Sequence, residues 1–397
     1  MSNLLNRVFD NLKQRRQNIL EGKINCIEFP FPRFRTIFPG IEKGKYYLIS
    51  GATKSSKTQL TNYIFVYTTV IYAYTHPNII TPKIFYYNLE ETEEAITLRF
   101  ICFLLYIYDN IRISPTDLGS TNKDKPVDKH ILDLIQTKKY TDILNFYEQV
   151  VEFKDDKSNP TAIWKDIKSY ANLNGVTYYK PCLYKNELGE TKEGQEFDYY
   201  IPNNPNEYVF IIVDHISLID TENNKTLREC INRLSSYMIL IKNRYKYIPV
   251  IVQQQSTETT NLEAFKSNKI RPTTAGLSDS KYTSKDCDVF MGITNPHFFE
   301  LPDYVGYDIT KLKSNFRILE IVLNRQGDSN NLCPLYFDGA INYYKELPLP
   351  SDKERMESIY NLITRNKLGN FVNKVPKSLF SLIAYSIKFI IKPTKNN

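Results

Sequence analysis

Short apolar runs recur along the chain, and helical patterns of apolar and polar positions separate them. Several runs are apolar on both faces, which is typical of parallel strands that helices cover on both sides. The runs that predict strands are "YYLIS" (46–50), "KIFYYNL" (83–89), "YVFIIVDHISLI" (208–219), "IPVIVQQQ" (248–255), "CDVFMGIT" (287–294) and "ILEIVLNR" (318–325). This alternation predicts an α/β fold with a central, mostly parallel sheet flanked by helices.

The ends of the chain and one internal segment depart from this alternation. Residues 3–21 have the pattern of a basic amphipathic helix, and "GVTYYKPCLY" and "EFDYYIP" flank a turn-rich stretch that predicts a hairpin insertion over about 173–207. The apolar run 378–392 is too short to span a bilayer and favours docking on the domain or on a replisome partner, with a membrane-surface helix as the alternative. We expect an arm and linker (1–40), a core domain (41–348) and a helical tail (349–397).

The composition is that of a soluble globular protein, with 42% hydrophobic and 24% charged residues among 397. A net charge of +7 permits a polyanionic partner without requiring one. The six cysteines form no C-x-x-C pair and there are four histidines, which disfavours a zinc site or a disulfide framework. Without a signal-peptide pattern, the expected location is the cytoplasm, or the host cytoplasm for a phage-encoded chain.

The stretch "LISGATKSSKTQL" (48–60) nearly matches the phosphate-binding pattern G-x-x-x-x-G-K-[ST]. Gly51, Lys57 and Thr58 are in place, while Ser56 occupies the second glycine position. Backbone N–H groups of such a loop surround a phosphate, the lysine reaches the β and γ phosphates of ATP, and the threonine hydroxyl binds Mg²⁺. The candidate nucleotide-binding residues are Gly51, Ala52, Thr53, Lys54, Ser55, Ser56, Lys57, Thr58 and Gln59.

Ligands of open α/β sheets bind beyond the carboxyl ends of the strands, so the residues after each apolar run are candidates for chemistry. Glu90 has the position of a general base for an attacking water, although acidic residues there also suit a helix start. Asp214 has the position of a carboxylate that holds Mg²⁺, or of a simple cap. Polar amides end "VIVQQQ", and Arg325 precedes a glycine turn.

Taken together and in order, these segments resemble the RecA-like ATPase domain of replicative hexameric DNA helicases of the DnaB type, over residues 14–346. "FPRFRTIFPGIEKGKYYLISGATKSSKT" resembles the family's leading segment and phosphate loop, "FYYNLEETEEAITLRF" its second strand, and "VFIIVDHISLI" its metal-binding strand. The resemblance implies that Glu90 is the catalytic base, Asp214 holds the metal, Gln255 senses the γ phosphate and Arg325 reaches a neighbour's nucleotide. Arg99 matches the helix arginine that follows the glutamate.

The resemblance also implies partners. ATP and Mg²⁺ are the expected ligands, and the chain is expected to form a homo-oligomer, a hexameric ring, around single-stranded DNA, with primase or polymerase as a replisome partner. "IRPTTAGLSDSKYTSKDCDVFMGI" resembles the DNA-facing loop region and the strand after it. The candidate DNA-binding residues in and beside it are Lys266, Lys269, Arg271 and Lys281; residues 220–226 form a second candidate loop.

The sequence departs from the family pattern in three ways. Ser56 replaces a glycine, Leu323 stands where the family has a second trans-acting lysine, and the family's N-terminal helical domain is absent, as in a phage version without it. Two other interpretations therefore stay open. One is a RecA-like recombinase or helicase loader, and the other is a virion-associated or structural nucleotide-binding protein whose hydrolysis has decayed.

Overall fold

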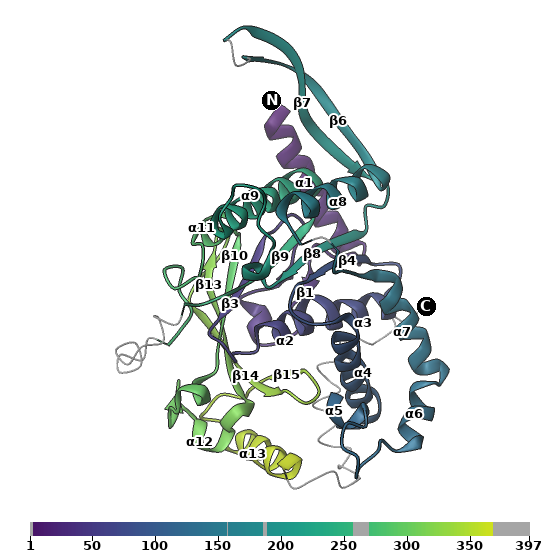
Figure 1. Ribbon diagram of the computed structural model, residues 1–397, viewed down its shortest axis with the longest axis vertical. Helices are drawn as coiled ribbons and strands as arrows, with labels where there is room; N and C mark the ends of the chain where they lie inside the picture. The colour runs from purple at the N-terminus through teal and green to yellow at the C-terminus, as the bar shows by residue number, and fades with distance from the viewer. Residues whose placement is uncertain (1–2, 157, 186–188, 257–269, 368–397) are drawn as a thin grey trace.

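The computed structural model describes residues 3–156, 158–185, 189–256 and 270–367, and its centre is a nine-stranded sheet (Figure 1). In spatial order the strands are β15 (Tyr343–Glu346), β14 (Asn331–Asp338), β13 (Phe316–Asn324), β10 (Val289–Thr294), β3 (Tyr47–Gly51), β9 (Ile248–Gln254), β8 (Glu207–Asp214), β4 (Thr81–Asn88) and β5 (Val151–Lys154). The predicted α/β architecture with a mostly parallel sheet is confirmed.

Strand direction decides which residues meet at each edge of the sheet. Strands β10, β3, β9, β8, β4 and β5 are mutually parallel, so β3, β9, β8 and β4 end at one common edge. Strand β13 pairs with β10 in the antiparallel sense, and β14 and β15 continue antiparallel. The first residues of β13 therefore lie at the edge where β3 ends, and its last residues lie at the opposite edge.

Side chains alternate between two buried faces along each central strand, as the period of two requires. On β8, Phe210 and Ile212 belong to one apolar cluster, whereas Ile211 and Val213 belong to the other. Each fully buried apolar side chain contributes about 1.5–3 kcal/mol. The helices are α1 (Asn3–Leu20), α2 (Lys57–Thr61), α3 (Thr68–Thr75), α4 (Glu93–Asp109), α5 (Pro115–Leu118), α6 (Lys129–Ile135), α7 (Lys138–Val150), α8 (Pro160–Leu173), α9 (Leu227–Tyr245), α11 (Tyr282–Asp286), α12 (Ile309–Leu312) and α13 (Lys353–Lys367).

Helices α3, α4 and α7 supply the first cluster, and α8 and α9 supply the second, so the sheet lies between two helical layers (Figure 1).

The positions at which α9 and α4 begin follow from their local sequences. Thr226 and Glu229 form a reciprocal capping box at the start of α9. Thr92 accepts a hydrogen bond from the Ala95 N–H at the start of α4.

The outer layer formed by α8 and α9 carries the single tryptophan of the chain. The Trp164 ring on α8 stacks on the Tyr237 ring of α9, with centroids 5.3 Å apart and an interplanar angle of 13°. Such a contact adds about 0.5–1.5 kcal/mol beyond the area it buries, so it helps to hold α8 against α9.

Strands β6 (Gly175–Lys185) and β7 (Thr191–Pro202) form an antiparallel hairpin that projects from the body (Figure 1). Tyr178 and Tyr199 stack across its two strands. Further along the hairpin, the Arg244 guanidinium lies over the Phe197 ring, which attaches the hairpin to the end of α9. No helix within the described residues is long and apolar enough to cross a membrane.

The remaining short strands lie outside the main sheet. They are β1 (Ile27–Glu28) with β2 (Gly40–Ile41), and β11 (Asp303–Tyr304) with β12 (Tyr307–Asp308). The apolar run 378–392 and the lysines at positions 266 and 269 lie outside the described residues.

Candidate functional site

The loop after β3 has the backbone conformation that its glycine pattern demands. A Cβ built on Gly51 would lie 2.4 Å from the Ile293 carbonyl oxygen, so this position excludes every larger residue. Lys54 has φ 60° and Ser56 has φ 72°, both in the left-handed region. A serine there costs about 1 kcal/mol relative to glycine. The second glycine position of the pattern is thus a left-handed position that serine occupies under strain.

Two residues that the sequence analysis did not identify contact Ser56. Arg317, the second residue of β13, donates from Nε to Ser56 Oγ over 2.9 Å. The Tyr344 hydroxyl on β15 donates to the same oxygen, also over 2.9 Å. Both come from far along the chain, and no spacing pattern marks them. The one signal in the sequence is an arginine near the start of a mostly apolar strand.

Lys57 and Asp214 occupy the same buried site at the common edge. The Lys57 ammonium donates to the Ala52 carbonyl over 3.1 Å. Burial lowers the pKa of Lys57, and the nearby Asp214 and Glu90 carboxylates act in the opposite direction. Asp214 is 2% exposed and accepts a hydrogen bond from the Tyr86 hydroxyl over 3.1 Å. The loop after β3 and the end of β8 therefore face each other.

The Asp214 carboxylate fits a magnesium ligand. Burial raises its pKa to about 6, while the Thr58 and Tyr86 hydroxyls pull the pKa down. Its second oxygen, Oδ1, has no hydrogen bond of good geometry within the described part of the chain. Mg²⁺ prefers carboxylate and hydroxyl oxygen ligands. Thr58 and Asp214 together offer such oxygens beside Lys57, so the residues present fit a bound Mg²⁺.

Asp214→Asn is expected to stabilise the nucleotide-free protein. Because the folded-state pKa lies above the ordinary value of 3.8, the charged carboxylate destabilises the fold progressively as pH rises from 3.8 through 6, by up to about 3 kcal/mol at pH 7. Asparagine removes this charge and still accepts the Tyr86 hydrogen bond. We expect the melting temperature at pH 7 to rise by about 2–5 °C and the gain to shrink toward pH 4. A lower melting temperature at pH 7 would contradict this, and the exposed Asp303→Asn is the control.

Glu90 follows β4 and lies at the mouth of the site. Its side chain is 54% exposed, and its Oε2 is 3.7 Å from His215 Nε2. Burial lowers the pKa of His215, and the Lys57 charge lowers it further while Glu90 raises it. Arg99 does not pair with Glu90 but with Glu91, over 2.5 Å. Neither His215 nor Glu91 is among the residues predicted from the sequence, although each adjoins one that is.

Gln253 and Gln254 at the end of β9, and Gln255 just after it, point in alternate directions. Gln253 donates to the Ser278 and Ser280 carbonyls, over 2.5 and 2.8 Å. Gln255 donates to Ser50 Oγ over 2.9 Å and its Oε1 accepts from the Thr273 N–H. Gln254 points the other way.

The side chain of Gln254, rather than that of Gln255, contacts Thr53 in the phosphate loop. Its Nε2 donates to the Thr53 hydroxyl. The sequence assigns the γ-phosphate sensor to Gln255, but that side chain is 4% exposed and anchors the segment that follows β9. The Gln254 side chain is therefore a second candidate for the sensor position. The reason is the period of two along a strand, which places neighbouring side chains on opposite faces.

Separate alanine variants distinguish the two glutamines. Gln254→Ala is expected to lower ATP turnover about 10- to 100-fold, because a donor near the phosphates is lost, with little change in melting temperature. Gln255→Ala is expected to destabilise the fold by about 1–3 kcal/mol, because the buried Ser50 hydroxyl and the Thr273 N–H each lose their partner. Turnover and thermal melts of both variants check this. If instead Gln255→Ala lowered turnover at unchanged stability and Gln254→Ala destabilised the fold, Gln255 would be the sensor.

Arg325 lies at the opposite edge of the sheet from the phosphate loop. Asn324 pairs with Val289 of β10, and Val289 pairs in turn with Tyr47 at the start of β3. Gly51 ends the same strand about 13 Å further along. The exposed Arg325 donates from Nε to the Cys287 carbonyl over 2.8 Å and from Nη2 to the Lys285 carbonyl. Arg325 therefore does not join the nucleotide site of its own chain.

The candidate DNA-binding residues differ in whether a nearby carboxylate pairs with their positive charge. Arg271 lies 3.6 Å from the Glu320 carboxylate and donates to the Tyr304 hydroxyl over 3.2 Å. Lys281 is exposed and precedes α11. In the second candidate loop, Glu222 binds Arg233 over 2.6 Å, so this loop carries a neutralised cluster. Of the described candidates, Lys281 presents the least compensated positive charge.

The architecture and the geometry of this edge define a RecA-like fold, and comparison with solved structures agrees. The chain is similar to the ATPase domain of G40P, with a TM-score of 0.56 and 12% identity, over 86% of this chain and 99% of that one. It is also similar to a DnaB-like replicative helicase described with its interactions with primase, with a TM-score of 0.59 and 12% identity, over 88% and 68%. No protein-family model matches the chain, and no curated protein matches its sequence.

Proposed function

We propose that this protein is an ATP-hydrolysing DNA helicase of the DnaB type that moves along single-stranded DNA as a ring oligomer. The observation that carries the proposal is the meeting of the phosphate loop, Lys57, the buried Asp214 and Glu90 at one edge of the sheet. These are a phosphate cradle, a cation, a metal ligand and a base, which are the groups that phosphoryl transfer to water needs.

Each residue has one role in the proposed reaction. The loop N–H groups and Lys57 bind the β and γ phosphates, and Lys57 stabilises the charge that develops as the bond to the γ phosphate breaks. Thr58 and Asp214 hold Mg²⁺, which supplies charge neutralisation at the phosphate oxygens. Glu90 orients the attacking water and accepts its proton. Its exposed position beside His215 gives it access to that water.

A second subunit completes the site in this proposal. Because Arg325 lies at the far edge of its own sheet, it can serve only the nucleotide of a neighbouring copy, in a heterologous interface that closes into a ring. Residues 41–348 then form the motor domain. The flanking regions 1–40 and 349–397 are proposed to contact neighbours or a replisome partner, primase or polymerase.

Two glutamines, Gln254 at the end of β9 and Gln255 just after it, connect this nucleotide site to the proposed DNA loop. Gln254 contacts Thr53 in the phosphate loop, and Gln255 contacts Thr273 in the segment that leads to Lys281. We propose that Lys281 and Arg271 bind DNA phosphates, together with Lys266 and Lys269, which precede Arg271 closely in the sequence. Binding of this kind weakens steeply as salt concentration rises.

The deciding experiment measures ATP hydrolysis with and without single-stranded DNA, and strand displacement on a forked duplex, with Lys57→Ala as the reference. Stimulation by DNA together with displacement is the expected result. Stimulation without displacement would indicate a recombinase or loader instead. Hydrolysis that is absent from the assembled wild type, or independent of Lys57, would leave a structural nucleotide-binding protein.

A further inference from the structure

Arg317 is a buried cation that touches the phosphate loop from the side of the core. Its side chain lies at the start of β13, and the residue is 5% exposed. Nε donates to the Ser55 carbonyl over 3.1 Å and to Ser56 Oγ over 2.9 Å. Nη1 donates to the Phe316 and Ser314 carbonyls. All of these acceptors are uncharged, so the hydrogen bonds orient the guanidinium without neutralising it.

The charge of Arg317 has no carboxylate partner within the described residues. Burial lowers its pKa to about 10, and the one neighbouring group that opposes this shift is Tyr344. The guanidinium is therefore still protonated at neutral pH. A buried charge is costly unless an opposite charge is supplied. The loop in front of Arg317 is the proposed binding place of an anionic ligand, so that ligand would supply the missing charge.

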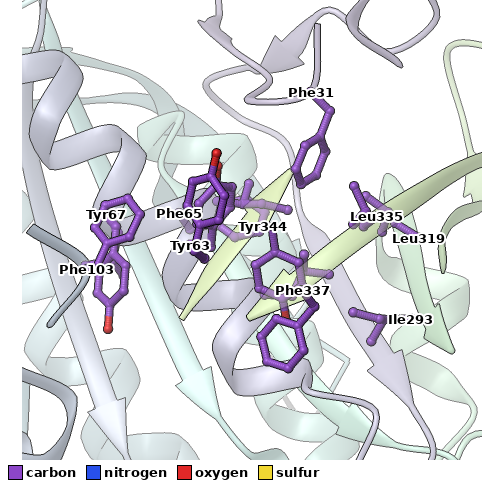
Figure 2. Packing of buried hydrophobic residues seen from close by; sticks show 14 of the residues in the cluster. Phe31, Tyr63, Phe65, Tyr67, Phe103, Ile293, Leu319, Leu335, Phe337 and Tyr344 are labelled. Carbon is purple, nitrogen blue, oxygen red and sulfur yellow. The ribbon is translucent and has the colours of Figure 1, made fainter. Parts of the chain in front are cut away.

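Tyr344 holds the same serine from β15. Its hydroxyl lies 2.9 Å from Ser56 Oγ and 3.1 Å from the Ser56 carbonyl oxygen. Its ring stacks on Phe337, with centroids 4.6 Å apart, and lies 5.3 Å from the Tyr63 ring (Figure 2). Because the ring is 1% exposed and packed on both sides, the hydroxyl has a fixed position.

The Ser56 hydroxyl uses its full hydrogen-bonding capacity. It donates to the Ser55 carbonyl and accepts from both Arg317 and Tyr344. A glycine at this position would relieve the left-handed strain but would offer no hydroxyl to either partner. The serine is therefore not simply a tolerated replacement, since two distant strands supply buried donors to it.

We propose that Ser56, Arg317 and Tyr344 form a positioning unit, which we name the serine clasp, that holds the phosphate loop in its nucleotide-binding conformation and presents an uncompensated positive charge to the polyphosphate. The ligand class, a nucleoside triphosphate or diphosphate, rests on the proposed function. Preorganisation of this kind improves affinity because the loop loses less freedom when the ligand binds.

The test combines Tyr344→Phe, Ser56→Gly and the double variant with a matched control. Tyr344→Phe removes one hydroxyl and keeps the stacked ring. Tyr200→Phe is the control, because the Tyr200 hydroxyl likewise donates to a backbone carbonyl, that of Ala171, at the hairpin base far from the loop. The measurements are the dissociation constant for a fluorescent ADP analogue, the melting temperature, and amide hydrogen exchange of residues 52–57 without nucleotide.

The serine clasp predicts that Tyr344→Phe and Ser56→Gly each weaken nucleotide binding about three- to tenfold, as expected for one lost hydrogen bond. Exchange of the loop amides should rise in both variants, and the double variant should be little worse than the weaker-binding single variant, because the partners act through one hydroxyl. The control should match the wild type in affinity and loop exchange.

Two results would overturn the clasp. One is that Ser56→Gly binds nucleotide as well as or better than the wild type; the other is that loop exchange is unchanged in Tyr344→Phe. The exchange measurement needs no nucleotide, so it decides the clasp even if the wild type binds none. Absence of nucleotide binding by the wild type would instead contradict the proposed function.

Discussion

Lys57→Ala is expected to lower the rate of ATP hydrolysis by about 10²–10³-fold or more. The ammonium group is partly buried near Asp214 and Glu90 and donates only to the Ala52 carbonyl among the described residues, so it is held at the loop and is ready to contact phosphate. Alanine removes the Lys57 ammonium group, the positive charge of the phosphate loop that lies near Asp214 and Glu90. Steady-state phosphate release at saturating ATP and Mg²⁺ measures the effect.

The control for Lys57 is Lys165→Ala, because Lys165 is an exposed lysine on α8 in the outer layer. Its hydrolysis rate should equal that of the wild type. Circular dichroism and melting temperature must be similar for all three proteins, so that a loss of rate reports on chemistry and not on folding. An unchanged rate in Lys57→Ala would remove the phosphate loop from the mechanism.

Arg325→Ala is expected to lower turnover by about 10³–10⁵-fold in the assembled protein, while nucleotide binding changes far less. The reason is geometric, since Arg325 lies at the edge of the sheet opposite Gly51 and acts on the site of the next subunit. Turnover per subunit and nucleotide affinity are measured at concentrations where the oligomer persists. The control is Arg355→Ala, because Arg355 is an exposed arginine on α13 whose one ion pair among the described residues is with Asp352, just before that helix.

Mixing the two inactive variants tests the trans arrangement directly. In a random mixed oligomer, about a quarter of the interfaces combine an intact loop from an Arg325→Ala subunit with an intact arginine from a Lys57→Ala subunit. Activity should therefore return on mixing, although neither variant is active alone. Failure to regain activity in verified mixed oligomers would show that Arg325 does not act across the interface.

The central architecture could be predicted because its signals are local. Strands β3, β4, β8, β9 and β10 are mostly apolar runs. Because they are parallel, their carboxyl ends lie at one edge of the sheet, whatever the conformation of the connecting loops. Asp214 and Lys57 therefore meet as the order of segments implies. The antiparallel direction of β13 is not encoded in its own pattern, because an apolar strand of either direction has the same sequence signature.

The details of the site depended on information that is not local. Gln254 and Gln255 are identical in type and adjacent, and only the strand's orientation decides which of them meets Thr53. Glu91 rather than Glu90 pairs with Arg99 because of the turn before α4. Arg317 and Tyr344 reach Ser56 from strands that follow it by more than two hundred residues. The sequence identified Ser56 as unusual but could not show what holds it.

The stack of Trp164 on Tyr237 determines what intrinsic fluorescence can report. Because Trp164 is the only tryptophan, emission excited at its absorption band comes from the contact between α8 and α9 and not from the phosphate loop. A fluorescence melt therefore follows the loss of the outer helical layer. Nucleotide occupancy, by contrast, has to be monitored with a labelled ligand, so the two optical signals separate unfolding from binding in every variant.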